Sequence, residues 1–203
     1  MTAQDKNEQH REEMKKQQAA HRQKMAEKAK QECGLLMVNT GSGKGKTTAA
    51  FGTVLRALGW NKKVGVVQFI KGKWKTGERL FFKRFEDLVD FRVMGEGFTW
   101  DTQDRERDIA AAREAWNVGL GMMQSGDYAL VVLDELNIVL RNDYLPVEEV
   151  IAGLQSRQKD CSVFVTGRDA PKELMEVADL VTEMQNIKHP FDAGFKPVRG
   201  VDF

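Results

Sequence analysis

The chain has 203 residues, enough for one α/β domain with a full core and too few for two large ones. Its 31 basic residues balance 30 acidic ones, and the resulting net charge of +1 excludes a chain-wide field that would attract nucleic acid or an anionic membrane. Its two cysteines and three histidines are scattered, which argues against a disulfide framework or a zinc site.

The first 33 residues differ in composition from the rest and form a predicted N-terminal helical arm. From Gln4 to Glu32 the chain is rich in Gln, Lys, Glu, Ala and Met and lacks Gly and Pro, which favours a helix. Its apolar stripe is thin, so the helix is either a solvated, partly disordered extension or an arm that orders by docking on a partner subunit. Without an apolar signal core or a membrane-spanning segment, we expect a cytoplasmic protein.

From residue 34 onward, strand and helix patterns alternate. This alternation predicts an α/β fold with a mostly parallel sheet flanked by helices, as in the RecA-like class of P-loop NTPases, over residues 34–203. Two strands are near-continuously apolar, as expected of strands covered on both faces. In chain order we predict strands at 34–39, 63–70, 89–94, 128–133 and 161–166, and helices at 46–59, 77–85, 102–124 and 146–158.

A glycine-rich, lysine-bearing turn joins the first strand to the first helix. Residues 40–52 read Thr-Gly-Ser-Gly-Lys-Gly-Lys-Thr-Thr-Ala-Ala-Phe-Gly, in which Thr40 stands where the P-loop pattern has its first glycine. Such a turn directs backbone N–H groups and a helix N-terminus at a polyphosphate; the alternative is a turn without a ligand. The predicted ATP-binding residues here are Gly41, Ser42, Gly43, Lys44, Gly45, Lys46, Thr47 and Thr48.

Asp134 and Glu135 follow the apolar run 129–133, at the carboxyl end of a predicted buried strand. Ligands bind at this edge of open α/β sheets, and a carboxylate there can hold Mg²⁺ together with the Thr47 hydroxyl. The alternative is an acid that caps the next helix. Beside the phosphate turn we favour Mg²⁺, with Thr47, Asp134 and Glu135 as candidate ligands.

Further basic residues are expected around the same edge. Lys71, Lys73 and Lys75 follow the second strand, and Arg168 follows the strand that ends at Thr166. Arg56 lies nearly three turns into the first helix. A solvated surface charge is the alternative for each of them, and we include Arg56 and Arg168 among the candidate ATP-binding residues.

Residues 95–101 place Phe98 and Trp100 in a glycine-containing loop. Aromatic side chains in loops often fold back into the core; the alternative is an apolar surface for a planar ligand beside the nucleotide.

Together these motifs resemble the ATP:corrinoid adenosyltransferases that make adenosylcobalamin. The resemblance rests on residues 40–52, 67–72, 97–100, 132–136, 143–146, 166–168 and 188–194, and so covers most of the chain. It implies that a reduced cob(I)alamin or related corrinoid attacks the ribose 5′-carbon of ATP and expels triphosphate, with Mg²⁺ present. The nucleophile is then the corrinoid cobalt, which accounts for the lack of a Ser, Cys or His triad.

The resemblance also implies roles for particular residues and partners. Lys44, Lys46, Thr47 and Glu135 would act in catalysis, while Phe98 and Trp100 would contact the corrinoid and exclude its lower axial ligand. A homodimer is implied, with the N-terminal helix covering a corrinoid site, and an electron donor such as a flavodoxin. Neither nucleic acid nor a membrane is an expected partner.

Two other functions fit the phosphate turn and the acidic strand end by themselves. One is a phosphotransferase or ATPase that acts on another small molecule, and the other is a nucleotide-gated regulatory protein without turnover. The products separate them, because only adenosyl transfer yields triphosphate and an adenosylated corrinoid.

Overall fold

The computed structural model describes residues 3–27, 33–70, 76–94 and 104–202, in two compact units, 1–32 and 33–203. The first unit contains α1 (Ala3–Glu27), which confirms a helix in the predicted arm. Side chains 5–26 are all exposed, so α1 has no face buried within its own unit. No described helix is long and apolar enough to span a bilayer.

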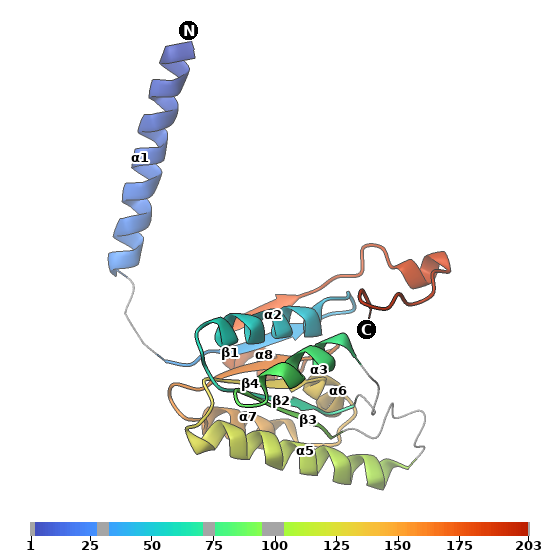
Figure 1. Cartoon of the computed structure of the whole chain (residues 1–203). Coiled ribbons are helices and arrows are strands. Elements are labelled where there is room, and N and C mark those ends of the chain that lie inside the picture. Colours follow the sequence, from blue (N-terminus) through green and yellow to red (C-terminus); the bar gives the residue numbers. More distant parts are fainter. Residues whose placement is uncertain (1–2, 28–32, 71–75, 95–103, 203) are drawn as a thin grey trace. The chain divides into compact units, whose positions relative to one another are not determined.

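The second unit is built on a six-stranded sheet in which every pair of neighbouring strands is parallel (Figure 1). The strand order is β3-β2-β4-β5-β1-β6, so β5 lies between β1, which enters the phosphate turn, and β4, which ends at Asp134. This arrangement confirms the predicted α/β class. The strands are β1 (Leu36–Thr40), β2 (Val64–Gln68), β3 (Val89–Val93), β4 (Leu130–Asp134), β5 (Ser162–Thr166) and β6 (Leu180–Glu183).

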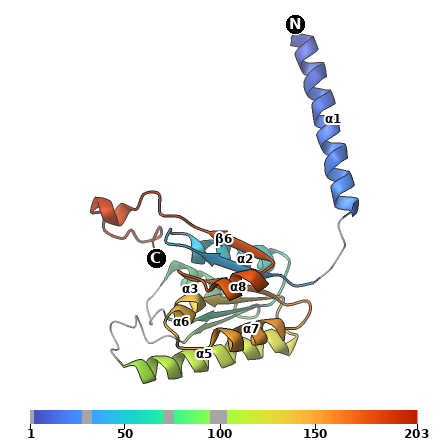
Figure 2. The same cartoon turned by 180° about the vertical axis from the view of Figure 1, so that it is seen from behind.

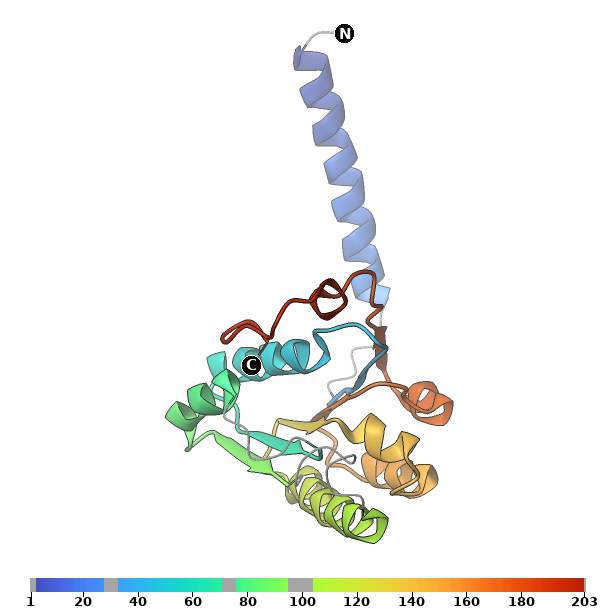
Figure 3. The same ribbon diagram turned by 90° about the vertical axis from the view of Figure 1, so that its right-hand side faces the viewer.

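Helices cover both faces of the sheet (Figures 1 and 3). On one face, α2 (Lys46–Gly59) and α3 (Gly77–Phe82), which the 3₁₀ turn Lys83–Phe85 extends, pack on inward residues such as Val66 and Val132. The opposite face carries α5 (Arg105–Ser125), α6 (Leu136–Arg141), α7 (Val147–Gln155) and α8 (Lys172–Val177), which enclose the larger core around Trp116. Because successive strand residues point to opposite faces, Val66 and Val67 belong to different cores.

Four described elements were not predicted: α6, α8, β6 and the 3₁₀ turn Pro190–Ala193. Figure 2 shows β6 at the edge of the sheet, where it pairs with β1 alone. Residues 180–183 are all exposed, so they lack the apolar pattern of a covered strand.

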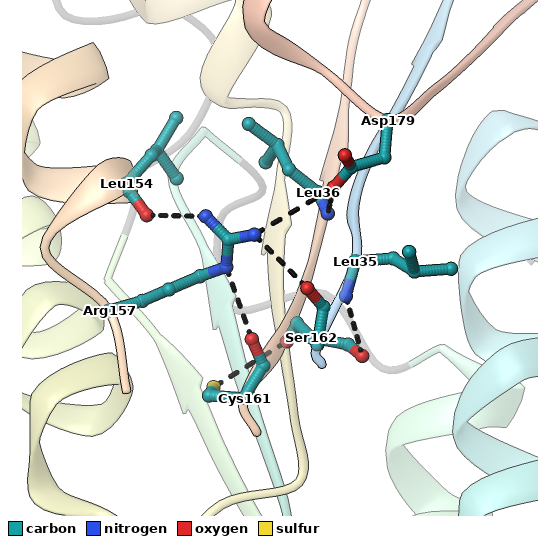
Figure 4. Close-up of polar contacts among 8 residues, drawn as sticks. Leu35, Leu36, Leu154, Arg157, Cys161, Ser162 and Asp179 are labelled. Atoms are coloured by element: carbon teal, nitrogen blue, oxygen red, sulfur yellow. Dashed lines mark hydrogen bonds and ion pairs between the residues drawn. The ribbon is translucent and has the colours of Figure 1, made fainter. Parts of the chain in front are cut away.

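Arg157 lies where several strands begin, at the amino-terminal ends of the sheet's strands (Figure 4). Its guanidinium donates to the carbonyl oxygens of Leu154 (2.9 Å), Cys161 (3.2 Å) and Gly34 (3.1 Å). Its Nη2 also lies 3.8 Å from Oδ2 of Asp179, and that oxygen accepts the N–H of Leu36 at 2.8 Å. One side chain thus joins the end of α7 to the segments that lead into β1, β5 and β6.

Candidate active site

The phosphate loop, residues 41–45 between β1 and α2, depends on glycine at two positions. Gly41 and Gly45 have φ angles of +92° and +111°, in the left-handed region that strains other residues. A Cβ on Gly41 would also lie 2.4 Å from the carbonyl oxygen of Met184. The loop therefore needs its glycine one residue after the position that the P-loop pattern gives.

Thr40 has a contact that a glycine could not make. It is the last residue of β1, and its hydroxyl accepts a hydrogen bond from the N–H of Ala170 at 3.0 Å. This bond ties the start of the phosphate loop to the segment between β5 and α8.

The far side of the phosphate loop rests on the segment that follows β6. The N–H of Gly43 donates to the carbonyl oxygen of Met184 at 2.7 Å, and a Cβ on Gly43 would lie 2.6 Å from the carbonyl oxygen of Gln185. In this conformation the Gly43 N–H stabilises the loop. We had expected this N–H to be directed at a ligand, and it is not. Gly43 instead supplies clearance for a close backbone approach.

Lys46 begins α2, and its ammonium folds back over the phosphate loop. Its Nζ donates to the carbonyl oxygens of Gly41 (2.7 Å) and Gly43 (2.6 Å). Burial lowers the pKa of Lys46, whereas the charge of Glu135 acts to raise it and that of Arg168 to lower it further. These charge effects place Glu135 and Arg168 in the same electrostatic environment as Lys46.

Asp134 is the buried centre of the site, with no exposed surface. Its Oδ1 accepts the hydroxyls of Thr47 (2.8 Å) and Thr166 (2.7 Å), and its Oδ2 accepts Nε2 of Gln68 at 2.8 Å. The structure thus brings the first turn of α2 into contact with the ends of β2, β4 and β5. Thr47 and Asp134, predicted to lie close together, are joined by a hydrogen bond.

Glu135, the residue after Asp134, has an unusual backbone conformation. Its φ of +68° is in the left-handed region, a strained conformation for a residue other than glycine, and its N–H donates to the Thr166 hydroxyl at 3.1 Å. This turn starts α6 directly after β4. As a result, Asp134 is fully buried whereas Glu135 is partly exposed.

The oxygen atoms around Asp134 suit a hard divalent cation. Such an ion would take a few ligands from the protein and the others from water and the substrate. Thr47, Asp134 and Glu135 offer oxygen atoms only, which is the chemistry that Mg²⁺ prefers. Among the described residues, no group of three or more His, Cys, Asp and Glu side chains forms a metal cage. The residues therefore fit a Mg²⁺ that arrives with a phosphorylated substrate.

Two further predicted cations lie near the loop. Lys44 is half-exposed and pairs with Asp202, whose carboxylate also accepts the N–H of Val198 at 2.7 Å. The hydrogen bond from Lys44 lowers the pKa of Asp202. Arg168 is exposed directly after β5 and Gly167. The C-terminal turn 198–202 therefore reaches the phosphate loop.

Arg56 is not brought to this site. It lies in the last turn of α2, ten residues and roughly 15 Å from Lys46 along the helix axis. There it lines a shallow groove with Trp60, Lys62 and Ser162 at the opposite edge of the sheet. Phe98, Trp100, Lys71, Lys73 and Lys75 lie outside the described residues.

Three buried side chains at the site were missed as site residues. Gln68 and Thr166 each end an apolar strand and contact Asp134. Asn137 donates through Nδ2 to the carbonyl oxygens of Asn39 (3.2 Å) and Gly167 (3.0 Å) and so joins α6 to the ends of β1 and β5. A polar residue at the carboxyl end of an apolar strand was the available pattern for Gln68 and Thr166.

Comparisons with known proteins agree with the geometry. The model of the family described as "ATP:corrinoid adenosyltransferase BtuR/CobO/CobP" matches residues 32–203. A corrinoid adenosyltransferase of Pseudomonas aeruginosa is 52% identical over 199 residues, which cover 98% of each chain. Corrinoid adenosyltransferases of Escherichia coli and Salmonella typhimurium are 50% and 49% identical over 175 residues, 86% of this chain and 88% of each relative.

Proposed function

The chain belongs to the ATP:corrinoid adenosyltransferase family, and we propose that its phosphate loop and the Asp134 cluster hold ATP for transfer of its 5′-deoxyadenosyl group to a reduced corrinoid. The protein is a transferase that uses ATP and a corrinoid as substrates. One observation carries the proposal: the Thr47–Asp134 hydrogen bond joins the first turn of α2, directly after the phosphate loop, to the carboxyl end of β4.

The reaction balances without a protein nucleophile. Cobalt(I) of the corrinoid donates an electron pair to the ribose 5′-carbon, a cobalt–carbon bond forms, and the bond from that carbon to the 5′-oxygen breaks. The electron pair of the broken bond leaves with triphosphate. Negative charge therefore develops on the bridging oxygen, and the task of the protein is to stabilise this leaving group.

We propose that Lys46 stabilises that charge. In the described conformation its ammonium is satisfied by two loop carbonyls, and bound triphosphate supplies stronger, charged acceptors at the same loop. We propose that Lys44, in the loop, and Arg168, after β5, add further positive charge at the site. We propose that the N–H groups at the start of α2, including those of Thr47 and Thr48, bind the phosphate oxygens.

For Mg²⁺ we propose Thr47 and the carboxylates of Asp134 and Glu135 as the protein ligands, directly or through water. When bound, the ion neutralises phosphate charge and orients the triphosphate. Asp134 accepts the hydrogen of the Thr47 hydroxyl, and this bond supports a shared role of the two side chains at the ion. The charge of Glu135 acts on Lys46, which supports a place for Glu135 at the same site.

The corrinoid half of the site is a proposal from sequence. We propose that Phe98 and Trp100 contact the corrinoid and exclude its lower axial ligand, which makes the cobalt easier to reduce because no axial donor stabilises the oxidised state. We further propose a homodimer in the cytoplasm, in which α1 covers a corrinoid site, and a reducing partner such as a flavodoxin.

The direct test combines the purified chain with ATP, Mg²⁺ and chemically reduced cobalamin. The proposal predicts that a light-sensitive adenosylated corrinoid forms. Absorption spectra recorded before and after illumination would detect it. A folded protein that leaves the corrinoid spectrum unchanged would rule the proposal out.

A further inference from the structure

Asp134 is held from both sides by the neighbouring strands. Gln68, the last residue of β2, lies directly opposite Asp134 in the β2–β4 register, and Thr166 ends β5 on the other side. Residues in register point to the same face of a sheet, and parallel strands end at the same edge. The alignment of the three strands therefore fixes the two side chains beside the Asp134 carboxylate.

The two neighbours divide the oxygens of that carboxylate. Gln68 Nε2 donates to Oδ2 at 2.8 Å, and the Thr166 hydroxyl donates to Oδ1 at 2.7 Å. Gln68 is 3% exposed, and both Thr166 and Asp134 are fully buried. Rotation of the carboxylate about its χ2 torsion would break both bonds, and an unmade bond at a buried group is costly.

The orientation of Asp134 in turn sets the orientation of Thr47. The Thr47 hydroxyl donates to the same Oδ1, at 2.8 Å. A carboxylate held at Oδ2 by Gln68 keeps Oδ1 directed at α2, and the hydrogen of the Thr47 hydroxyl stays on Oδ1. The side chain of Thr47, in the first turn of α2, is thereby held in one orientation.

We infer that Gln68 and Thr166 are positioning residues that hold Asp134, and through it Thr47, in the orientation that couples a divalent cation to ATP. The inference rests on the proposed binding of Mg²⁺ with ATP at this site. Gln68 acts as a neutral donor at Oδ2, a role that a carboxylate cannot fill because it would repel Asp134. The Thr166 hydroxyl also accepts the N–H of Glu135 at 3.1 Å. One hydroxyl thus contacts both Asp134 and Glu135, the two carboxylate residues proposed as Mg²⁺ ligands.

The test measures the dissociation constant of ATP by calorimetry, once with Mg²⁺ and once with a chelator. The ratio of the two constants reports how strongly the cation and the nucleotide support each other. Wild-type protein should bind ATP more tightly with Mg²⁺. In Gln68→Leu the tightening of ATP binding by Mg²⁺ should become about tenfold smaller, the usual effect of losing a group that orients a metal ligand. The dissociation constant of ATP measured without Mg²⁺, in the presence of the chelator, should stay as in the wild type.

Two matched variants separate positioning from general damage. Gln124→Leu makes the same change on α5, where the exposed amide donates to the Ser156 hydroxyl at 2.9 Å. This variant should keep the wild-type ratio. Thr166→Ser retains the hydroxyl and should keep most of the ratio, whereas Thr166→Val, which has nearly the same shape, should lose it. If Gln68→Leu does not fold, comparison of Thr166→Val with Thr166→Ser still tests the inference.

Three results would overturn the inference. They are a wild-type ratio of one, an unchanged ratio in both Gln68→Leu and Thr166→Val, and equal weakening of ATP binding with and without Mg²⁺, which would indicate a distorted loop. None of these measurements involves corrinoid. Failure of adenosyl transfer is therefore distinguishable from failure of this inference.

Discussion

At the scale of single residues, Lys46 is the cation most closely built into the phosphate loop. Lys46→Ala removes a buried ammonium that, on the proposed mechanism, stabilises the leaving group, so kcat/KM for ATP should fall about 10²- to 10³-fold, as when one preorganised donor to a developing charge is removed. Lys44→Ala is the matched control; because Lys44 is half-exposed and screened, its loss should be much smaller. Equal losses, measured with pre-reduced cobalamin, would contradict this distinction.

The two cysteines should differ in reactivity. Burial raises the pKa of Cys161 to about 11, whereas the Cys33 side chain is exposed. At pH 8 the Cys161 thiol stays protonated and inaccessible, so iodoacetamide should label one cysteine per folded chain and two after denaturation, as counted by mass spectrometry. Cys33→Ser should remove the labelling of the folded chain; fast labelling of that variant would show that Cys161 is open.

The same shift has a consequence for stability. A thiol with the ordinary pKa of 9.0 in the unfolded chain ionises before the folded one does, so the stabilisation is present below pH 9.0 and is lost as pH rises toward 11. Wild-type protein should lose more stability over this range than Cys161→Ala, as measured by urea unfolding. Parallel pH profiles would contradict the raised pKa.

Sequence reasoning identified the site residues that belong to a recognisable motif better than those that do not. Thr47 and Asp134 could be predicted because a phosphate turn and an acid after a buried strand each carry a recognisable pattern. Gln68 and Thr166 could not be assigned a role in this way, since their importance comes from strand order and register. Arg56 was misplaced in expectation because helix length, rather than residue type, carries it to the other edge of the sheet.

At the scale of elements, Arg157 fixes the segments that begin β1, β5 and β6 (Figure 4). Arg157→Lys keeps the charge but loses the planar set of donors, so we expect about 2 kcal/mol of lost stability, measured by urea unfolding. Arg113→Lys, in an exposed ion pair with Glu149, is the control and should cost less than about 1 kcal/mol. Equal losses in the two variants would refute a clamping role.

Elements with a clear apolar pattern were predicted well and those without one poorly. The helix at 46–59 has the bounds of α2, and five of the six strands of the sheet, β1 to β5, were placed within two residues at each end. By contrast, α6 and α8 have six residues each, too few for a helical period to show. The edge strand β6 is held by the backbone of β1 and leaves its side chains exposed, so its sequence lacks a strand pattern.

At the scale of the whole molecule, the two units should separate corrinoid use from nucleotide binding. Residues 5–26 of α1 are all exposed, so we expect deletion of residues 1–32 to leave the thermal midpoint of unit 33–203 unchanged. On the proposed covering role, the deletion should raise KM for corrinoid about tenfold, or about 1.4 kcal/mol, with little effect on ATP. Unchanged corrinoid kinetics would exclude that role.

The central claim is that the phosphate loop holds triphosphate as a leaving group. Phosphorus NMR of a reaction with ATP, Mg²⁺ and reduced cobalamin tests it most directly, because the chemical shifts and couplings distinguish triphosphate from ADP and phosphate. We predict inorganic triphosphate in a one-to-one ratio with adenosylated corrinoid. ADP and phosphate, formed without an adenosylated corrinoid, would contradict the account.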